Sequence, residues 1–167
     1  MSVARAYIGL GANLGDRRAQ IEGALEAMAS HGMRLIAVSP LYETEPWGVT
    51  DQPRFLNAAC AVETDLPPHA LLDALQAIER DMGRVRTVPY GPRPIDLDIL
   101  MYDDVRIDTE RLSIPHPGML ERATVLVPLA DIAPDRVHPV TGRTVREHLA
   151  DLGPTPDVAP YPPGLPD

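Results

Sequence analysis

Pro94-Ile-Asp-Leu-Asp-Ile-Leu100 alternates apolar and acidic residues over a short run. Successive side chains of a β-strand point to opposite faces of its sheet, so a period of two predicts a strand with one apolar and one acidic face. The three apolar residues between Pro94 and Leu100 would face the core, whereas Asp96 and Asp98 would face the opposite way. The stretch therefore predicts a sheet with one buried face and one face that carries two carboxylates.

The segments before this strand predict the rest of the fold. Apolar periodicity, prolines and glycines indicate, in chain order, a strand over 3–10, a helix over 17–31, a strand over 33–42 interrupted at Pro40, a strand over 55–63, a helix over 67–82 and the strand over 94–102. This βαββαβ order predicts an α+β fold, a ferredoxin-like sandwich. Its helices would cover one face of an antiparallel sheet and leave the other face free for a site.

The C-terminal third predicts additions to that core. We expect a short strand over 105–107 that pairs with 94–102, a helix over 119–130, a hairpin over 137–145 and a helix over 146–152. Residues 153–167 contain six prolines in fifteen positions, which predicts an extended tail without a core of its own. The predicted organisation is one domain over 1–152 followed by a proline-rich tail over 153–167.

Length and composition limit the classes of protein. The chain has 167 residues, 44% of them hydrophobic, as expected for one globular domain. No apolar run approaches the ~20 residues of a membrane span, and the first residues lack the apolar segment of a signal peptide, so we expect a cytoplasmic protein without a membrane partner. Cys60 is the only cysteine, which excludes an internal disulfide, and the net charge of −9 disfavours a nucleic-acid partner.

The chain contains no lysine, and all 15 of its cationic Lys/Arg positions are arginines. A GC-rich genome is sufficient to explain this bias. Its chemical consequence still holds, because any bound phosphate must be gripped by guanidinium groups and any lysine-based mechanism is excluded.

The acidic pair in the strand over 94–102 has the spacing of a metal site. Carboxylates at positions i and i+2 lie about 6.6 Å apart along a strand, so their oxygens can converge on one or two ions. Hard oxygen ligands favour magnesium. The alternative is a strand whose acidic face is simply solvated. Nearby Arg84, Arg86 and Arg93 favour a metal-bound polyphosphate over that alternative.

Other phosphate-binding signatures fail. The glycines of Gly9-Leu-Gly-Ala-Asn-Leu-Gly15 miss the dinucleotide fingerprint, since Leu14 stands at the third glycine position, and a Walker-type loop needs a lysine. A tight strand-to-helix turn is the remaining use of this segment. His116 lies between two prolines, where a rigid turn would fix the imidazole for a phosphate oxygen; a plain surface histidine is the alternative.

Two further groups admit a functional or a structural interpretation. Glu79 follows the apolar stripe of the second helix, where a solvated glutamate is the simpler interpretation. Trp47 and Phe55 flank Thr44 and Asn57, and aromatic rings beside an amide can stack on and hydrogen-bond a flat heterocycle. Core packing of both rings is the alternative.

Five segments together resemble the 6-hydroxymethyl-7,8-dihydropterin pyrophosphokinase family: Gly9–Gly15, Ser39–Thr44, Asp51–Ala58, Gly91–Asp98 and Ile114–Gly118. The resemblance runs over about 7–134. It implies a ferredoxin-like fold and a reaction of folate synthesis, in which ATP donates its β,γ-pyrophosphoryl group to the pterin hydroxymethyl oxygen and AMP is released.

The resemblance also implies roles for individual residues. Asp96 and Asp98 would bind two magnesium ions, and Arg84 and Arg93 would act on the phosphates as catalytic residues. The residues implied to bind the nucleotide, some through backbone only, are Glu79, Arg86, Ile99, Arg111, Leu112, Ser113 and His116. Those implied to contact pterin are Thr44, Trp47, Phe55, Asn57 and Tyr90, the last as part of a lid over 84–92 that excludes water.

This sequence departs from the family pattern at Thr124, where a second aromatic would sandwich the pterin, and at Pro117. The expected partners are a small pterin and ATP, bound by a monomer. Two rival interpretations remain from the residues themselves. One is a metal-dependent nucleotidyltransferase or cyclase, which would release pyrophosphate instead of AMP. The other is a non-enzymatic ligand-sensing module of ferredoxin-like fold, which would bind without turnover.

Overall fold

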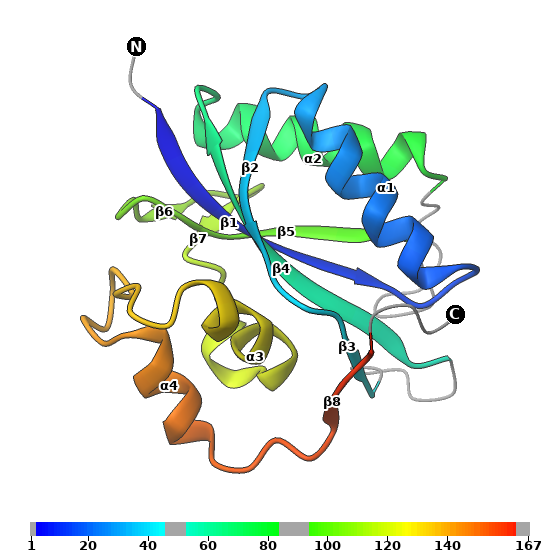
Figure 1. Ribbon diagram of the computed structural model, residues 1–167. Helices are drawn as coiled ribbons and strands as arrows, with labels where there is room; N and C mark the ends of the chain where they lie inside the picture. Colours follow the sequence, from blue (N-terminus) through cyan, green and yellow to red (C-terminus); the bar gives the residue numbers. More distant parts are fainter. Residues whose placement is uncertain (1–2, 46–52, 84–93, 163–167) are drawn as a thin grey trace.

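A computed structural model of the chain describes residues 3–45, 53–83 and 94–162. Its centre is a six-stranded antiparallel sheet in the order β5-β1-β4-β3-β8, with β2 also paired to β4 (Figure 1). The strands are β1 (Ala4–Ala12), β2 (Met33–Val38), β3 (Tyr42–Thr44), β4 (Phe55–Thr64), β5 (Asp96–Tyr102) and β8 (Val158–Pro160). A separate two-stranded sheet joins β6 (Ile107–Asp108) to β7 (Ser113–Ile114).

Helices α1 (Arg17–Ala29) and α2 (Pro68–Asp81) cover one face of the sheet. Their apolar stripes, which include Ile21 and Leu75, are fully buried against every second residue of β1, β4 and β5. Asp16 caps α1, since its carboxylate accepts a hydrogen bond from the Ala19 amide at 3.1 Å. The periodicity of the sequence therefore predicts this layer correctly.

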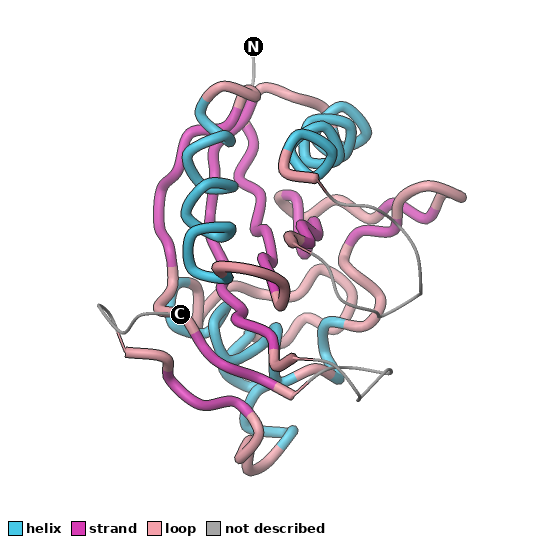
Figure 2. The backbone as a smooth tube through the Cα atoms, turned by 90° about the vertical axis from the view of Figure 1, so that its right-hand side faces the viewer, coloured by secondary structure: helices cyan, strands magenta, loops and turns pink. Residues whose placement is uncertain are grey.

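The opposite face differs from the prediction. The 3-10 turn η1 (Met119–Glu121) and helices α3 (Ala123–Ile132) and α4 (Val145–Leu152) pack there, so helices lie on both sides of the strands (Figures 1 and 2). The expectation of helices on one face only is wrong because α3 is apolar over most of its surface and must be buried. Tyr7 and Ala61 of the sheet provide the surface on which Leu126 and Leu129 pack.

A bulge in β5 helps to set which residues face α3. Tyr7 of β1 pairs with Met101, whereas the next residue of β1, Ile8, pairs with Ile99, so Leu100 is left without a partner in β1. Leu100 and Met101 both pack in the cluster under α3, while Ile99 belongs to the core under α1 and α2. The bulge thus joins an apolar end of the strand to the end that begins with the two aspartates.

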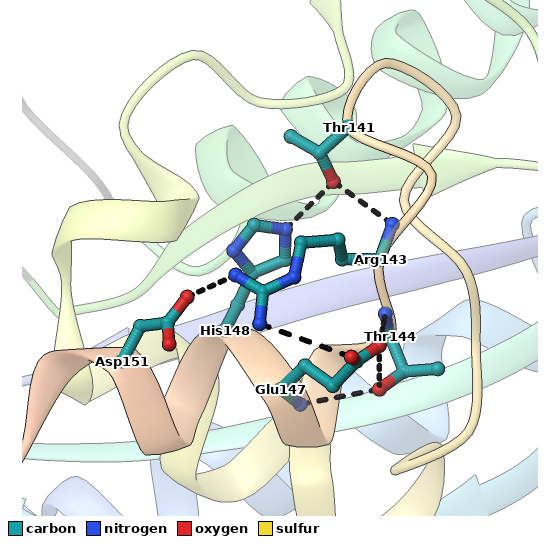
Figure 3. Close-up of polar contacts among 6 residues, drawn as sticks. All are labelled: Thr141, Arg143, Thr144, Glu147, His148 and Asp151. Carbon is teal, nitrogen blue, oxygen red and sulfur yellow. Dashed lines mark hydrogen bonds and ion pairs between the residues drawn. The ribbon is translucent and has the colours of Figure 1, made fainter.

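The C-terminal additions follow the prediction in part. The hairpin is reduced to one bridge between Val137 and Thr144, and α4 begins with a reciprocal cap (Figure 3). Glu147 N donates to Thr144 Oγ1 at 3.1 Å, and Thr144 N donates to Glu147 Oε1 at 3.0 Å. The strand expected over 105–107 pairs differently, because β6 joins β7 and not β5.

The tail contributes β8, which pairs with β3 at the edge of the main sheet. Among the described residues, no helix is both long enough and apolar enough to cross a membrane.

Candidate active site

Helix α3 covers only part of one face of the sheet. The uncovered part of that face carries a pocket. Cross-strand register places Asp96, Gly11 and Asn57 in one row over β5, β1 and β4, and Asp98, Gly9 and Ala59 in the next. These rows leave a glycine floor between the two acidic side chains and the Asn57 amide. The residues that line the pocket include Gly9, Gly11, Phe55, Asn57, Asp96, Asp98, Leu100, Thr124 and Val125.

Gly11 has a steric reason to be glycine. A Cβ at this position would stand 2.9 Å from Asn57 Oδ1 and 3.6 Å from the Phe55 ring, so a side chain here would push Asn57 aside. At Gly9 the nearest atom to such a Cβ is 3.4 Å away, on the Leu100 side chain. The floor is therefore narrowest at Gly11.

The two aspartates lie as the alternation of the strand predicts. Asp96 and Asp98 are half-buried and line the pocket, while Ile95, Leu97 and Ile99 are buried in the core on the opposite face. Ile99 was expected near a nucleotide. Since its side chain lies in the core, its backbone is the part that can serve a ligand on the pocket face.

Glu79 supports the strand that carries the acidic pair. Only 5% of it is exposed, and its Oε2 accepts a hydrogen bond from Leu97 N at 2.8 Å. The solvated glutamate that the sequence allowed is therefore excluded. Because the Leu97 amide lies between Asp96 and Asp98, this contact links α2 to the position of both carboxylates.

His116 holds its imidazole in a fixed orientation near Asp96. Its Nδ1 accepts a hydrogen bond from Gly118 N at 3.1 Å, so in the neutral ring the proton is on Nε2, which is left as a donor. Burial lowers the pKa of His116, the Arg122 guanidinium lowers it further, and Asp96 opposes the shift. The alternative of a plain surface histidine does not fit this half-buried, oriented ring.

Arg122 lies beside Gly118 and His116, and the sequence does not predict it there. Its guanidinium lies 3.1 Å from the point where a Cβ on Gly118 would stand, and it acts electrostatically on His116. It comes directly before α3, two positions ahead of the pocket residue Thr124. Its position two residues before Thr124 is the one feature of the sequence that could have indicated a place near the pocket. An isolated arginine belongs to no motif.

Three of the residues expected around a heterocycle, Thr44, Phe55 and Asn57, come together at the Asn57 end of the pocket. Asn57 Nδ2 donates to Thr44 Oγ1 at 2.5 Å, and Thr44 is almost fully buried. Phe55 lines one side and Thr124 lies at the start of α3. Phe55 is the one aromatic among the described lining residues.

Three other predicted residues do not line the pocket: Arg111 and Leu112 lie between β6 and β7, and Ser113 begins β7. Arg111 forms an ion pair with Asp73 of α2 at 2.7 Å, and Leu112 is buried in the core. Ser113 donates a hydrogen bond to Asp108 at 3.3 Å. The remaining predicted residues lie outside the described part of the chain: Trp47, Arg84, Arg86, Tyr90 and Arg93.

Comparison with known proteins decides the family. The sequence model of 7,8-dihydro-6-hydroxymethylpterin-pyrophosphokinase matches residues 7–134, which is most of the chain. The chain belongs to this family. The family is one of enzymes that act in folate synthesis with ATP as co-substrate.

Individual relatives agree with the family match. A 2-amino-4-hydroxy-6-hydroxymethyldihydropteridine pyrophosphokinase of Methylorubrum extorquens is 53% identical over 152 residues, which covers 90% of this chain and 95% of the relative. The protein of the same description from Pseudomonas aeruginosa is 51% identical over 149 residues, covering 89% and 91%. These matches extend over nearly the whole of both relatives.

Solved structures share the fold at low sequence identity. An HPPK-DHPS protein in complex with substrates superposes with a TM-score of 0.74 at 16% identity, over 90% of this chain and 43% of that one. The wild-type Plasmodium falciparum HPPK-DHPS with pteroate gives a TM-score of 0.72 at 18% identity. The present chain thus spans less than half the length of these solved proteins, and the likeness concerns the fold.

Proposed function

We propose that this chain transfers the β,γ-pyrophosphoryl group of ATP to the hydroxymethyl oxygen of 6-hydroxymethyl-7,8-dihydropterin. The observation that carries the proposal is the glycine floor between Asn57 and Asp96. Two strand spacings separate these residues, about 10 Å. A flat heterocycle can lie over Gly11 with its ring at Asn57 and Phe55 and its hydroxymethyl group toward the aspartates.

The chemical step is a displacement at phosphorus. The pterin oxygen forms a bond to the β-phosphorus, the bond from that phosphorus to the oxygen bridging the α-phosphate breaks, and AMP leaves. The hydroxyl proton is lost in the same process. Asp96 is the acceptor that we assign for it, because this carboxylate lies on the pocket face and shares a row with Gly11 and Asn57.

The acidic pair fits a magnesium site. Asp96 and Asp98 offer hard oxygen ligands on one face of the sheet, and this is the ligand type that magnesium prefers. Magnesium keeps several waters and substrate oxygens, so two protein carboxylates suffice. We propose two ions, which when bound would neutralise charge on the triphosphate.

The remaining residues of the site orient and stabilise. His116 Nε2 is a donor for a phosphate oxygen, since its Nδ1 is already occupied by the Gly118 amide. Arg93 lies three positions before Asp96 in the chain, and we propose that it and Arg84 counter the charge on the transferring group. Thr44 holds the Asn57 amide in one orientation, so that the amide can hydrogen-bond the heterocycle.

We also infer that the fold is a ferredoxin-like βαββαβ sandwich to which α3, α4 and β8 are added. The strand order β5-β1-β4-β2, antiparallel at every step, supports this inference. Both substrates are small molecules, and the proposal takes the chain to act as a monomer.

Product analysis tests the proposed reaction. The protein is mixed with ATP, magnesium and 6-hydroxymethyl-7,8-dihydropterin, and nucleotides are separated by chromatography. AMP and pyrophosphorylated pterin in equal amounts are expected. Release of pyrophosphate would instead indicate the nucleotidyltransferase or cyclase, and binding of both ligands without turnover would indicate the sensing module.

A further inference from the structure

Strand β8 in the tail of the chain extends one edge of the sheet. This edge lies beside the pocket. Strand β8 pairs antiparallel with β3 (Figure 1). Beyond the strand, Tyr161 N donates to Leu41 O at 2.9 Å. Since hydrogen-bonded and non-bonded pairs alternate, Ala159 opposite Glu43 occupies the next bonded position. Pro160 falls at a non-bonded position, where the missing N–H costs no ladder bond.

The start of α1 holds the same segment from the side. The guanidiniums of Arg17 and Arg18 lie 5.5 Å and 5.4 Å from the centre of the Tyr161 ring. Arg18 also donates to the Pro162 carbonyl at 2.9 Å, and Arg17 forms an ion pair with Glu43 of β3 at 3.0 Å. The tail is therefore tied both to β3 and to the helix that flanks it.

Strand β3, which the tail pins, carries groups that shape one wall of the pocket. Its Thr44 accepts the hydrogen bond that orients the Asn57 amide. Its Tyr42 hydroxyl donates to Asp131 near the C-terminal end of α3, and this contact joins β3 to the helix whose first residues line the pocket. The aspartates lie on β5, separated from β3 by β4 and β1. Thr44 and Asn57 form what we call the Asn57 wall of the pocket. A displacement of β3 would therefore move the Asn57 wall more than it moves the two aspartates.

We infer that residues 154–162 act in cis as a positioning strand for the Asn57 wall of the pocket and thereby set the affinity for the pterin. The inference rests on the proposed function for the identity of that ligand. Without the strand, β3 would be a three-residue edge with one partner, and Thr44 would lose the support that fixes it against Asn57.

Truncation with rescue by a peptide tests the inference. A chain that ends at Gly153 is compared with one that ends at Pro162, which keeps every described contact of the strand. The first is expected to show a KM for pterin about tenfold higher, with the KM for ATP within about twofold of the parent, and the second is expected to match the parent. A synthetic peptide of residues 154–167 should lower the KM for pterin again by adding as a strand.

A point variant covers the case in which the shorter chain does not fold. Ala159→Pro removes the amide at the bonded position of the full chain and should raise the KM for pterin, whereas Ala159→Gly, at the same position, keeps that amide and should not. Equal rises in the KM for pterin and ATP, or a loss of kcat alone, would overturn the inference, as would parent-like kinetics in both the truncation and Ala159→Pro.

Amide hydrogen exchange separates this inference from the proposed function. Faster exchange at Thr44 and Asn57 in the truncated chain, reversed by the peptide, is expected whether or not the parent turns over the pterin. Unchanged exchange at these two residues would overturn the positioning role even in an active pyrophosphokinase. An inactive parent whose exchange responds to the tail would refute the proposed function and leave the coupling of tail and wall standing.

Discussion

One face of the central sheet is divided into a covered half and an open half. In the covered half, Tyr7, Ala61 and Met101 align across three strands and are buried under α3. In the open half, the row of Gly11, Asn57 and Asp96 faces the pocket. The same strands serve both halves, so the boundary lies within β1, β4 and β5 and not between elements.

The difference shows how a small domain combines a packed core with a site on one surface. Apolar side chains in the covered half gain stability from burial, whereas glycine and carboxylate in the open half gain nothing from packing. Substitutions in the two halves should therefore separate stability from turnover.

Asp96→Asn should give the largest loss of turnover. The amide keeps the shape of the side chain but removes the negative charge and the proton acceptor, and removing a comparable charge-stabilising group costs about 10²–10³ in kcat. The KM for pterin should change much less, and the melting temperature should not fall. Steady-state kinetics and thermal unfolding measure both. Equal losses in turnover and pterin affinity would contradict the assigned role.

Leu129→Ala should have the reverse effect in the covered half. Leu129 is a fully buried residue of α3 that packs against the sheet, and truncating a buried leucine costs about 2–5 kcal/mol of unfolding free energy. Turnover measured well below the melting temperature should stay within about threefold of the parent. Denaturant unfolding gives the stability. A variant that keeps its stability but loses turnover would contradict the assignment of the covered half to stability and the open half to turnover.

Gly11→Ala should damage pterin binding in the open half. The new methyl would stand 2.9 Å from Asn57 Oδ1, so the amide must move away from its contact with Thr44. Loss of one hydrogen bond of this kind is worth about 1 kcal/mol, which predicts a KM for pterin several-fold to tenfold higher. Gly9→Ala is the matched control, because its methyl meets Leu100 at an ordinary 3.4 Å. Similar effects of both variants would exclude Asn57 as the cause.

Thr124→Phe should strengthen pterin binding in the open half by adding a second aromatic ring to the pocket. Thr124 lies in the pocket lining with Phe55, and a second aromatic there could stack on the pterin. Stacking of a base on an aromatic is worth about 1–3 kcal/mol, so the KM for pterin should fall about tenfold. Thr124→Leu adds a comparable apolar volume without an aromatic face and is the control. An equal gain from leucine would indicate apolar contact in place of stacking.

The sequence predicts the open half better than the covered one. The alternation from Pro94 to Leu100 is sufficient to place Asp96 and Asp98 on one face, and the structure has them there. By contrast, no local pattern says which face of the sheet an apolar helix such as α3 will cover, because that depends on the surface which Tyr7 and Ala61 offer. The same limit applies to Glu79, whose buried bond to Leu97 joins distant segments and has no signature in the sequence.

Two histidines, His116 and His138, lie in turns of the same kind at different places in the chain. His116 Nδ1 accepts from the amide two residues later, Gly118 N, and His138 Nδ1 accepts in the same way from Val140 N at 3.2 Å. Each ring is followed by a proline. Burial lowers the pKa of both histidines. Arg122 lowers the pKa of His116 further, and His148 and Arg106 lower that of His138.

The smallest predicted effect is a pH dependence shared by these histidines. Because their pKa values are lower in the folded state, the unfolded chain binds more protons, and stability should fall as pH drops through the unfolded value of about 6.5. His138→Asn keeps an acceptor for the amide but cannot be protonated, so the drop in melting temperature from pH 7.5 to 5.5 should shrink while turnover at pH 7.5 is unchanged. His116→Asn should shrink the drop too, but it should lower turnover at every pH, since His116 Nε2 faces the phosphates in the proposed reaction. Full activity in His116→Asn would remove this histidine from the site and leave both turns with a purely structural role.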